Sequence, residues 1–148
     1  MGEPQSSKVN RVPPSPLAMM VCDAVVRDPA TSKSTLCGCF TTIAAKVFPA
    51  THPVLWVYVA LTDGHGKNLI SLRLVDADET LDPIFEMQQE TEFKEPRVVL
   101  EMCFVVQNVV FPVAGEYRLQ LHADGQHVIE RRIVVMGLAD NTAGGGHA

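Results

Sequence analysis

Alternation of apolar and polar side chains in residues 108–135 constrains the fold more than any other feature of the chain. Residues 117–122 alternate strictly, which is typical of a strand with one buried face. Asp124 and Gly125 follow, and because glycine accepts a positive φ without steric cost, a tight reversal is expected there. Residues 129–135 then place isoleucine and valine mainly on one parity. The segment therefore predicts an antiparallel β-hairpin.

The rest of the chain repeats short apolar runs separated by Gly, Pro and Asp, and it shows no convincing long helix. Eight short strands at near-regular spacing predict an all-β fold, with a single antiparallel β-sandwich preferred to a barrel. Gly115, two residues before Tyr117 at the entry to a late strand, resembles the tyrosine corner of Greek-key sandwiches and favours an immunoglobulin-like topology. The predicted strands are 17–27, 34–43, 54–62, 68–76, 84–93, 97–110, 117–122 and 129–135.

The segment 84–93 is the ambiguous one. Its glutamates and glutamines suit a helical turn by propensity, but Phe85, Met87 and Gln89 also alternate. A strand is favoured, and a helix stays open as the alternative.

Composition divides the chain into three parts. Residues 1–16 contain serines and prolines with almost no apolar content, so they cannot offset their ordering entropy and a disordered tail is expected. Residues 17–136 form the predicted β-sandwich domain, and the Gly-rich residues 137–148 form a second flexible tail.

Charge and cysteine usage narrow the class of protein. A net charge of −5 without any basic block argues against binding to nucleic acid or to an anionic membrane. The apolar run 17–26 is too short to span a bilayer, and the polar start of the chain does not resemble a secretory signal. Four cysteines without framework spacing fit a reducing compartment, so a cytoplasmic location is expected.

Three cysteines are the first candidates for chemistry. Cys37 and Cys39 lie two apart on a predicted strand, hence on one face, and Cys22 lies on the preceding strand. Three thiolates could meet on one metal ion, but C-x-C within a strand is weak spacing for a metal site and no fourth ligand is obvious. Free cysteine is a common small core residue. We expect no metal and no cofactor.

Loop carboxylates are the second candidates. In an antiparallel sandwich every second loop gathers at one end, where clustered carboxylates could bind calcium. Aspartate also favours turns because it bonds to nearby backbone, and this interpretation is preferred. The metal-binding candidates are Asp28, Asp63 and Asp124, with His65 and Glu95 expected at the same end.

No set of nucleophile, base and oxyanion donor emerges from the sequence. The five histidines lack zinc-protease spacing, and no G-x-S-x-G turn or phosphate-binding glycine loop occurs. His122 and His127 flank the predicted turn and are expected to be cross-strand neighbours, either a pH-sensitive pair or two ordinary exposed residues. We expect a protein that is not an enzyme and has no catalytic residue.

Two predicted strands, 54–62 and 97–110, are apolar on both faces, although a sandwich strand needs only one buried face. If they are neighbours in one sheet, their outer side chains merge into an apolar patch of a kind that monomers rarely expose. The patch is predicted to bind a second subunit or another protein, unless a tail or the segment 84–93 covers it. The patch residues are Trp56, Tyr58, Val99, Cys103 and Val105.

The chain also resembles a family of short bacterial proteins known mainly as a domain of unknown function. A Cys-Asp strand, a Lys-containing turn, a Gly-x-Phe strand, a Phe-Pro connection and a Gly-x-Tyr hairpin occur in the family's order, and Thr41 departs from an acidic position. The resemblance covers roughly residues 17–135, implies a β-sandwich in a bacterial cytoplasm, and carries over no catalytic residue. The matching residues are Cys22, Asp23, Lys33, Gly38, Phe40, Phe48, Pro49, Gly115 and Tyr117.

The leading hypothesis is therefore a non-catalytic β-sandwich that acts through protein–protein contact, by self-association or by docking to a larger assembly. The alternative is a ligand- or divalent-metal-binding module that uses the end-loop carboxylates.

Overall fold

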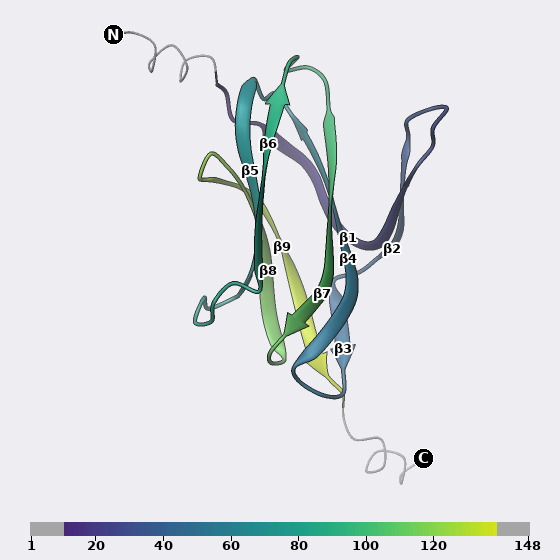
Figure 1. Ribbon diagram of the computed structural model, residues 1–148, viewed down its shortest axis with the longest axis vertical. Coiled ribbons are helices and arrows are strands. Elements are labelled where there is room, and N and C mark those ends of the chain that lie inside the picture. Colours follow the sequence, from purple (N-terminus) through teal and green to yellow (C-terminus); the bar gives the residue numbers. More distant parts are fainter. Residues whose placement is uncertain (1–10, 139–148) are drawn as a thin grey trace.

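The computed structural model describes residues 11–138, and these residues form nine strands and no helix (Figure 1). The predicted all-β class is confirmed. The strands are β1 (Ser15–Arg27), β2 (Ser34–Cys39), β3 (Thr42–Ala45), β4 (Ala50–Thr62), β5 (Gly66–Asp76), β6 (Phe85–Phe93), β7 (Leu100–Phe111), β8 (Gly115–Ala123) and β9 (Gln126–Gly137).

The strands make two sheets that share one hydrophobic core. One sheet has the order β2-β1-β4-β7 and the other the order β3-β9-β8-β5-β6. Neighbouring strands are antiparallel, apart from β3 and β9, which run parallel. Both sheets contribute fully buried side chains to this core, among them Leu55 and Val57 of β4, Leu72 of β5 and Leu119 of β8. Each such side chain contributes about 1.5–3 kcal/mol on burial, so packing between the sheets dominates the stability of the fold.

The β8–β9 hairpin forms as the alternation predicts. Tyr117, Leu119 and Leu121 are buried on the core face of β8. Asp124 and Gly125 make the reversal with φ of 50° and 83°. The positive φ at both positions matches the twist of the flanking strands, which is the reason for Asp-Gly at this turn.

The prediction of one strand over 34–43 is wrong, and with it the count of eight strands. The run forms β2 in one sheet and β3 in the other. Gly38 has a φ of 67°, a conformation that favours glycine, and it interrupts the regular β1–β2 pairing. The carbonyl of Thr41 then accepts a hydrogen bond from the backbone of Val134 at 2.9 Å, so the chain has reached β9. Side-chain spacing indicates that a run is extended but not which sheet it pairs with, which is why the sequence pattern did not show the break.

The segment 84–93 is a strand, as favoured. β6 pairs with β5 in a continuous antiparallel ladder from Gly66 opposite Phe93 to Leu74 opposite Phe85. Strand propensity depends on what a side chain packs against, so pairing with β5 outweighs the helical preference of the glutamates and glutamines.

β4 begins at Ala50, four residues before the predicted strand 54–62. The register between β4 and β7 is the same before and after Pro53, which places Asn108 opposite this proline. Asn108 has a φ of 55°, which makes the ladder irregular at this position. Because proline has no backbone N–H, the irregularity breaks no hydrogen bond that residue 53 could donate.

β1 takes part in two different pairings. From Ser15 to Cys22 it pairs with β4, and from Cys22 to Arg27 it pairs with β2. Beyond Cys22 the two strands leave the sheet as a two-stranded hairpin, which stands out from the body of the molecule at the right of Figure 1.

Most of the two predicted tails lies outside the described residues, as residues 1–10 and 139–148. Within the predicted N-terminal tail 1–16, Val12 forms an isolated antiparallel bridge with His65, and β1 starts at Ser15.

Candidate functional site

β4 and β7 are neighbours, and they place four of the five patch residues side by side. Trp56 lies opposite Val105, and Tyr58 lies opposite Cys103. Side chains directly opposite each other have Cβ atoms about 4.5–5.5 Å apart, so the four side chains form one continuous surface. Val99 immediately precedes β7. These five residues are called the outer patch below.

The outer patch is partly exposed and reaches the edge of its sheet. Val105 is 42% exposed and Val99 is 47% exposed, and Cys103 is exposed as well. Trp56 and Tyr58 are half-buried. Because β7 is the last strand in the order β2-β1-β4-β7, one side of its backbone has no strand partner in the described structure.

A polar cluster around Glu101 lies beside the outer patch, and the sequence expectations did not include it. The Glu101 carboxylate accepts hydrogen bonds from the hydroxyl of Tyr58 at 2.5 Å, the hydroxyl of Ser34 at 2.8 Å and the guanidinium of Arg27 at 2.6 Å. The signal that could have found it is a single charge inside the apolar run 98–110.

The electrostatics of this cluster favour a structural role. The hydrogen bond from Tyr58, and then the one from Ser34, lower the pKa of Glu101. Burial, together with the bond to Glu101, raises the pKa of Tyr58 to about 12. Both groups are thus moved away from neutral pH, whereas a general acid or base works best with a pKa near the operating pH.

The cluster anchors the β1–β2 hairpin next to the outer patch. In the sheet order β1 and β4 separate β2 from β7, yet the Ser34 hydroxyl lies 2.8 Å from Glu101. The hairpin must therefore curl toward the outer face of β4 and β7. The alternative that 84–93 covers the patch is wrong, because β6 belongs to the other sheet. The other alternative, that a tail covers the outer patch, involves residues that lie mostly outside the described range 11–138.

The cysteines lie as their spacing suggests, on facing strands. Cys39 is opposite Cys22, and Cys37 is opposite Ala24. Cys22 is fully buried, while Cys37 and Cys39 are exposed. Within residues 11–138, no three or more His, Cys, Asp or Glu side chains come together in a way that could hold a metal ion.

The three candidate carboxylates lie at turns. Asp28 accepts a hydrogen bond from the backbone of Ala30 at 2.9 Å, and Asp124 accepts one from the backbone of Leu69 at 2.9 Å. Asp63 adopts a φ of 63° at the β4–β5 reversal. The Asp28 bond is the local role that makes aspartate common in turns, whereas the Asp124 bond joins the β8–β9 turn to β5.

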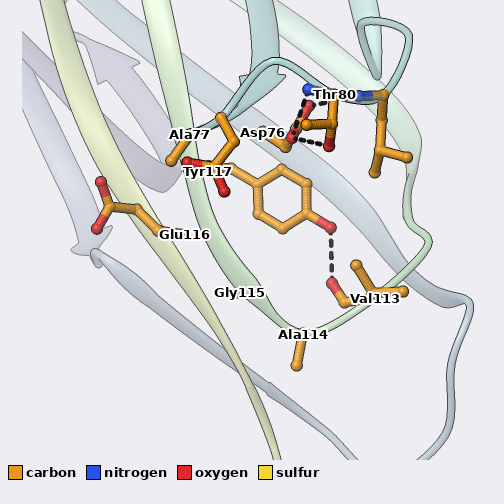
Figure 2. A pocket seen from close by; sticks show the side chains of 10 residues that line it. Asp76, Ala77, Thr80, Val113, Ala114, Gly115, Glu116 and Tyr117 are labelled. Carbon is orange, nitrogen blue, oxygen red and sulfur yellow. Dashed lines mark hydrogen bonds between the residues drawn. The ribbon is translucent and has the colours of Figure 1, made fainter.

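A concavity of about 470 Å³ lies at the entry to β8, and Tyr117 is one of the residues that line it (Figure 2). The Tyr117 hydroxyl donates to the carbonyl of Val113 at 2.6 Å, across the bend at Gly115. This is the bond expected of a tyrosine corner. The same concavity holds Asp76, which accepts hydrogen bonds from the backbone and the hydroxyl of Thr80 at 3.0 and 2.9 Å.

His122 and His127 are cross-strand neighbours, as predicted, with ring centroids 5.5 Å apart. Burial, and then the neighbouring His127, lower the pKa of His122. His127 also lies 3.2 Å from Glu130, which gives its Nε2 a partner on the same strand.

These features define a small all-β protein with an apolar patch at a sheet edge and a hairpin anchored beside it. Residues 17–136 match the family described as "Family of unknown function (DUF6941)". The chain therefore belongs to this family, as its resemblance to a domain of unknown function implied. A search of curated proteins finds no match to the chain. No helix long and apolar enough to cross a membrane occurs in residues 11–138.

Proposed function

We propose that this protein is a non-catalytic β-sandwich that acts through protein–protein contact at the outer patch. The observation that carries the proposal is the side-by-side placement of Trp56, Tyr58, Cys103 and Val105 on two neighbouring strands. Aromatic residues anchor protein interfaces, and continuous exposed apolar surface marks interaction sites.

The edge of β7 supports self-association as the form of this contact. An edge strand presents unpaired N–H and C=O groups that another strand can pair with. Glu101 is the only charged residue of β7, and Arg27 already neutralises it. β6, an edge strand of the other sheet, carries Glu86, Glu90 and Glu92, which would repel a second copy of themselves.

We also infer an immunoglobulin-like Greek-key arrangement in a bacterial cytoplasm. The passages from β4 to β5, from β6 to β7 and from β7 to β8 all cross between the sheets, and Tyr117 makes a corner at the entry to β8. The four free cysteines fit a reducing compartment.

Size-exclusion chromatography with light scattering tests the self-association. We expect an oligomer that Val105→Glu dissociates while the circular dichroism spectrum stays unchanged. Val47→Glu is the matched control, since Val47 is 73% exposed and lies outside the outer patch. Val105 is preferred to Tyr58 for the test, because replacing Tyr58 would also remove a hydrogen bond to Glu101.

Two outcomes would contradict self-association at this surface. One is a wild-type protein that stays monomeric at the highest concentration reached. The other is an oligomer that Val105→Glu leaves intact, or that both valine variants dissociate equally.

A further inference from the structure

We propose that Cys22 and Cys39 are a redox-active pair that closes a reversible disulfide between β1 and β2, with a small-molecule disulfide such as oxidised glutathione as the oxidant. The pair is formed by one fully buried thiol and one exposed thiol on facing strands. The pair lies where the β1–β2 hairpin leaves the sheet, because β1 stops pairing with β4 and starts pairing with β2 at Cys22.

The hydrogen bonds of the backbone show how closely the two residues face each other. Cys22 and Cys39 are directly opposite in the antiparallel register, and the backbone of Phe40 donates to the carbonyl of Val21 at 3.0 Å. A bond between the residues that flank a facing pair makes that pair a non-hydrogen-bonded one. In such pairs the Cα atoms are about 4.5 Å apart. Disulfides occur at Cα separations of about 4.4–6.8 Å, so the pair is within bonding range.

The other two cysteines are less well placed. Cys37 faces Ala24 rather than a thiol. Cys103 lies on β7, two strands away from β1 in the sheet. Neighbouring strands are about 4.8 Å apart, so this separation of nearly 10 Å exceeds the range of a disulfide.

Exposure gives each thiol a different part in the reaction. The exposed Cys39 thiolate attacks the oxidant, which forms a mixed disulfide on Cys39 and releases one glutathione thiolate. The buried Cys22 thiolate then attacks the Cys39 sulfur, which forms the Cys22–Cys39 bond and releases the second glutathione thiolate. The two protons lost by the cysteines are taken up by these leaving groups. Two protein thiols are oxidised and one glutathione disulfide is reduced to two thiols.

Burial raises the pKa of Cys22, which makes it a poor first attacker and is consistent with its role as the resolving thiol. The bond joins β1 to β2 next to Trp56, the β4 neighbour of Cys22. Oxidation therefore joins the two strands of the β1–β2 hairpin covalently at the end next to the sheet. Glu101 holds the other end of the hairpin through Arg27 and Ser34.

The test is a comparison of two double variants that each keep one cysteine on β1 and one on β2. Cys37→Ser with Cys103→Ser retains the facing pair Cys22 and Cys39. Cys39→Ser with Cys103→Ser retains Cys22 and Cys37, which are offset by two residues along β2. Both proteins are reduced, freed of reductant, incubated with oxidised glutathione, blocked with an alkylating agent and weighed by mass spectrometry. Circular dichroism checks that both are folded.

We expect the facing pair to lose two hydrogens without gaining glutathione, and dithiothreitol to reverse the change. We expect the offset pair to retain a glutathione adduct on Cys37. In the wild type, tryptic digestion under non-reducing conditions should yield peptide 12–27 linked to peptide 34–46. The proposal is overturned if the facing pair accumulates glutathione on Cys39, if it forms only intermolecular dimers, or if the offset pair closes equally well.

Discussion

Single polar side chains fix the geometry of this apolar fold at two places. Tyr117 ties the entry of β8 to Val113, and Glu101 of β7 binds both the β1–β2 hairpin and Tyr58 of β4. In both cases a long side chain replaces backbone pairing where the chain leaves a sheet.

Tyr117 is expected to be a stability residue. It is 1% exposed and makes an edge contact with Phe111 at 5.0 Å between ring centroids. Tyr117→Ala should lower the free energy of unfolding by about 3–5 kcal/mol, as for other large aromatic core residues. Tyr117→Phe should lower it by about 1 kcal/mol, because only the hydrogen bond to Val113 is lost. Urea unfolding measures both, and near-zero loss in both variants would disprove the role of the corner.

Glu101 should make the stability depend on pH in the acid range. Its pKa is lowered in the folded state from an ordinary value of 4.5, so its contribution is complete above the unfolded pKa and is lost as pH falls through the folded pKa. Glu101→Gln should therefore destabilise the protein at pH 7, and the difference from wild type should shrink as the pH falls below about 4.5.

Urea unfolding at a series of pH values measures this difference. Glu90→Gln is the control, since Glu90 is an exposed glutamate on β6. A constant difference between wild type and Glu101→Gln from pH 7 to pH 3 would show that the carboxylate charge does not hold the hairpin.

At the scale of elements, the break between β2 and β3 decides the topology. Gly38 interrupts the β1–β2 ladder with a positive φ, and Asp23 lies directly over it. The ladder resumes at Cys39, opposite Cys22, before the chain passes to β3. A short run can thus finish one sheet and begin the other. The hairpin stands away from the sheet because β1 stops pairing with β4 at Cys22 and continues with β2 alone.

Gly38→Ala should destabilise the protein more than Gly125→Ala. Both glycines have a positive φ, 67° and 83°, so both variants bear the cost of an alanine in this region, about 1–2 kcal/mol. A Cβ on Gly38 would also lie 2.5 Å from Oδ2 of Asp23, whereas a Cβ on Gly125 meets nothing within 4 Å. Thermal unfolding of the two variants measures the difference, and equal losses would show that the Asp23 contact has no weight.

At the scale of the whole molecule, the two sheets depend on one core. Buried side chains of β4 and of β5 and β8 belong to the same hydrophobic cluster. Neither sheet has another described layer to bury its apolar face against, so neither is expected to persist without the other.

A cavity in one sheet should therefore destabilise the other by the same amount. Leu119→Ala in β8 should cost about 2–5 kcal/mol. The fluorescence of Trp56, the single tryptophan, reports on the opposite sheet, while circular dichroism reports on both. The two signals should shift together to one lower midpoint. Separate midpoints would mean that the sheets unfold independently.

Periodicity alone was sufficient for the local elements. The Asp124-Gly125 hairpin, the buried parity of β8 and the two-faced apolar character of β4 and β7 all follow from side-chain spacing and the steric freedom of glycine. The cross-strand facing of His122 and His127 follows from the same turn. These features depend on residues close together in the chain.

The tertiary structure decided whatever joins residues far apart in sequence. The passage from β2 to β3, the strand state of 84–93 and the meeting of Arg27 with Glu101 each depend on partners many residues away. Alternation indicates which side of a strand is apolar. It does not indicate which strand lies beside that strand, or where the chain passes from one sheet to the other. Those choices follow from the packing of both sheets on one core, and that packing is a property of the folded chain as a whole.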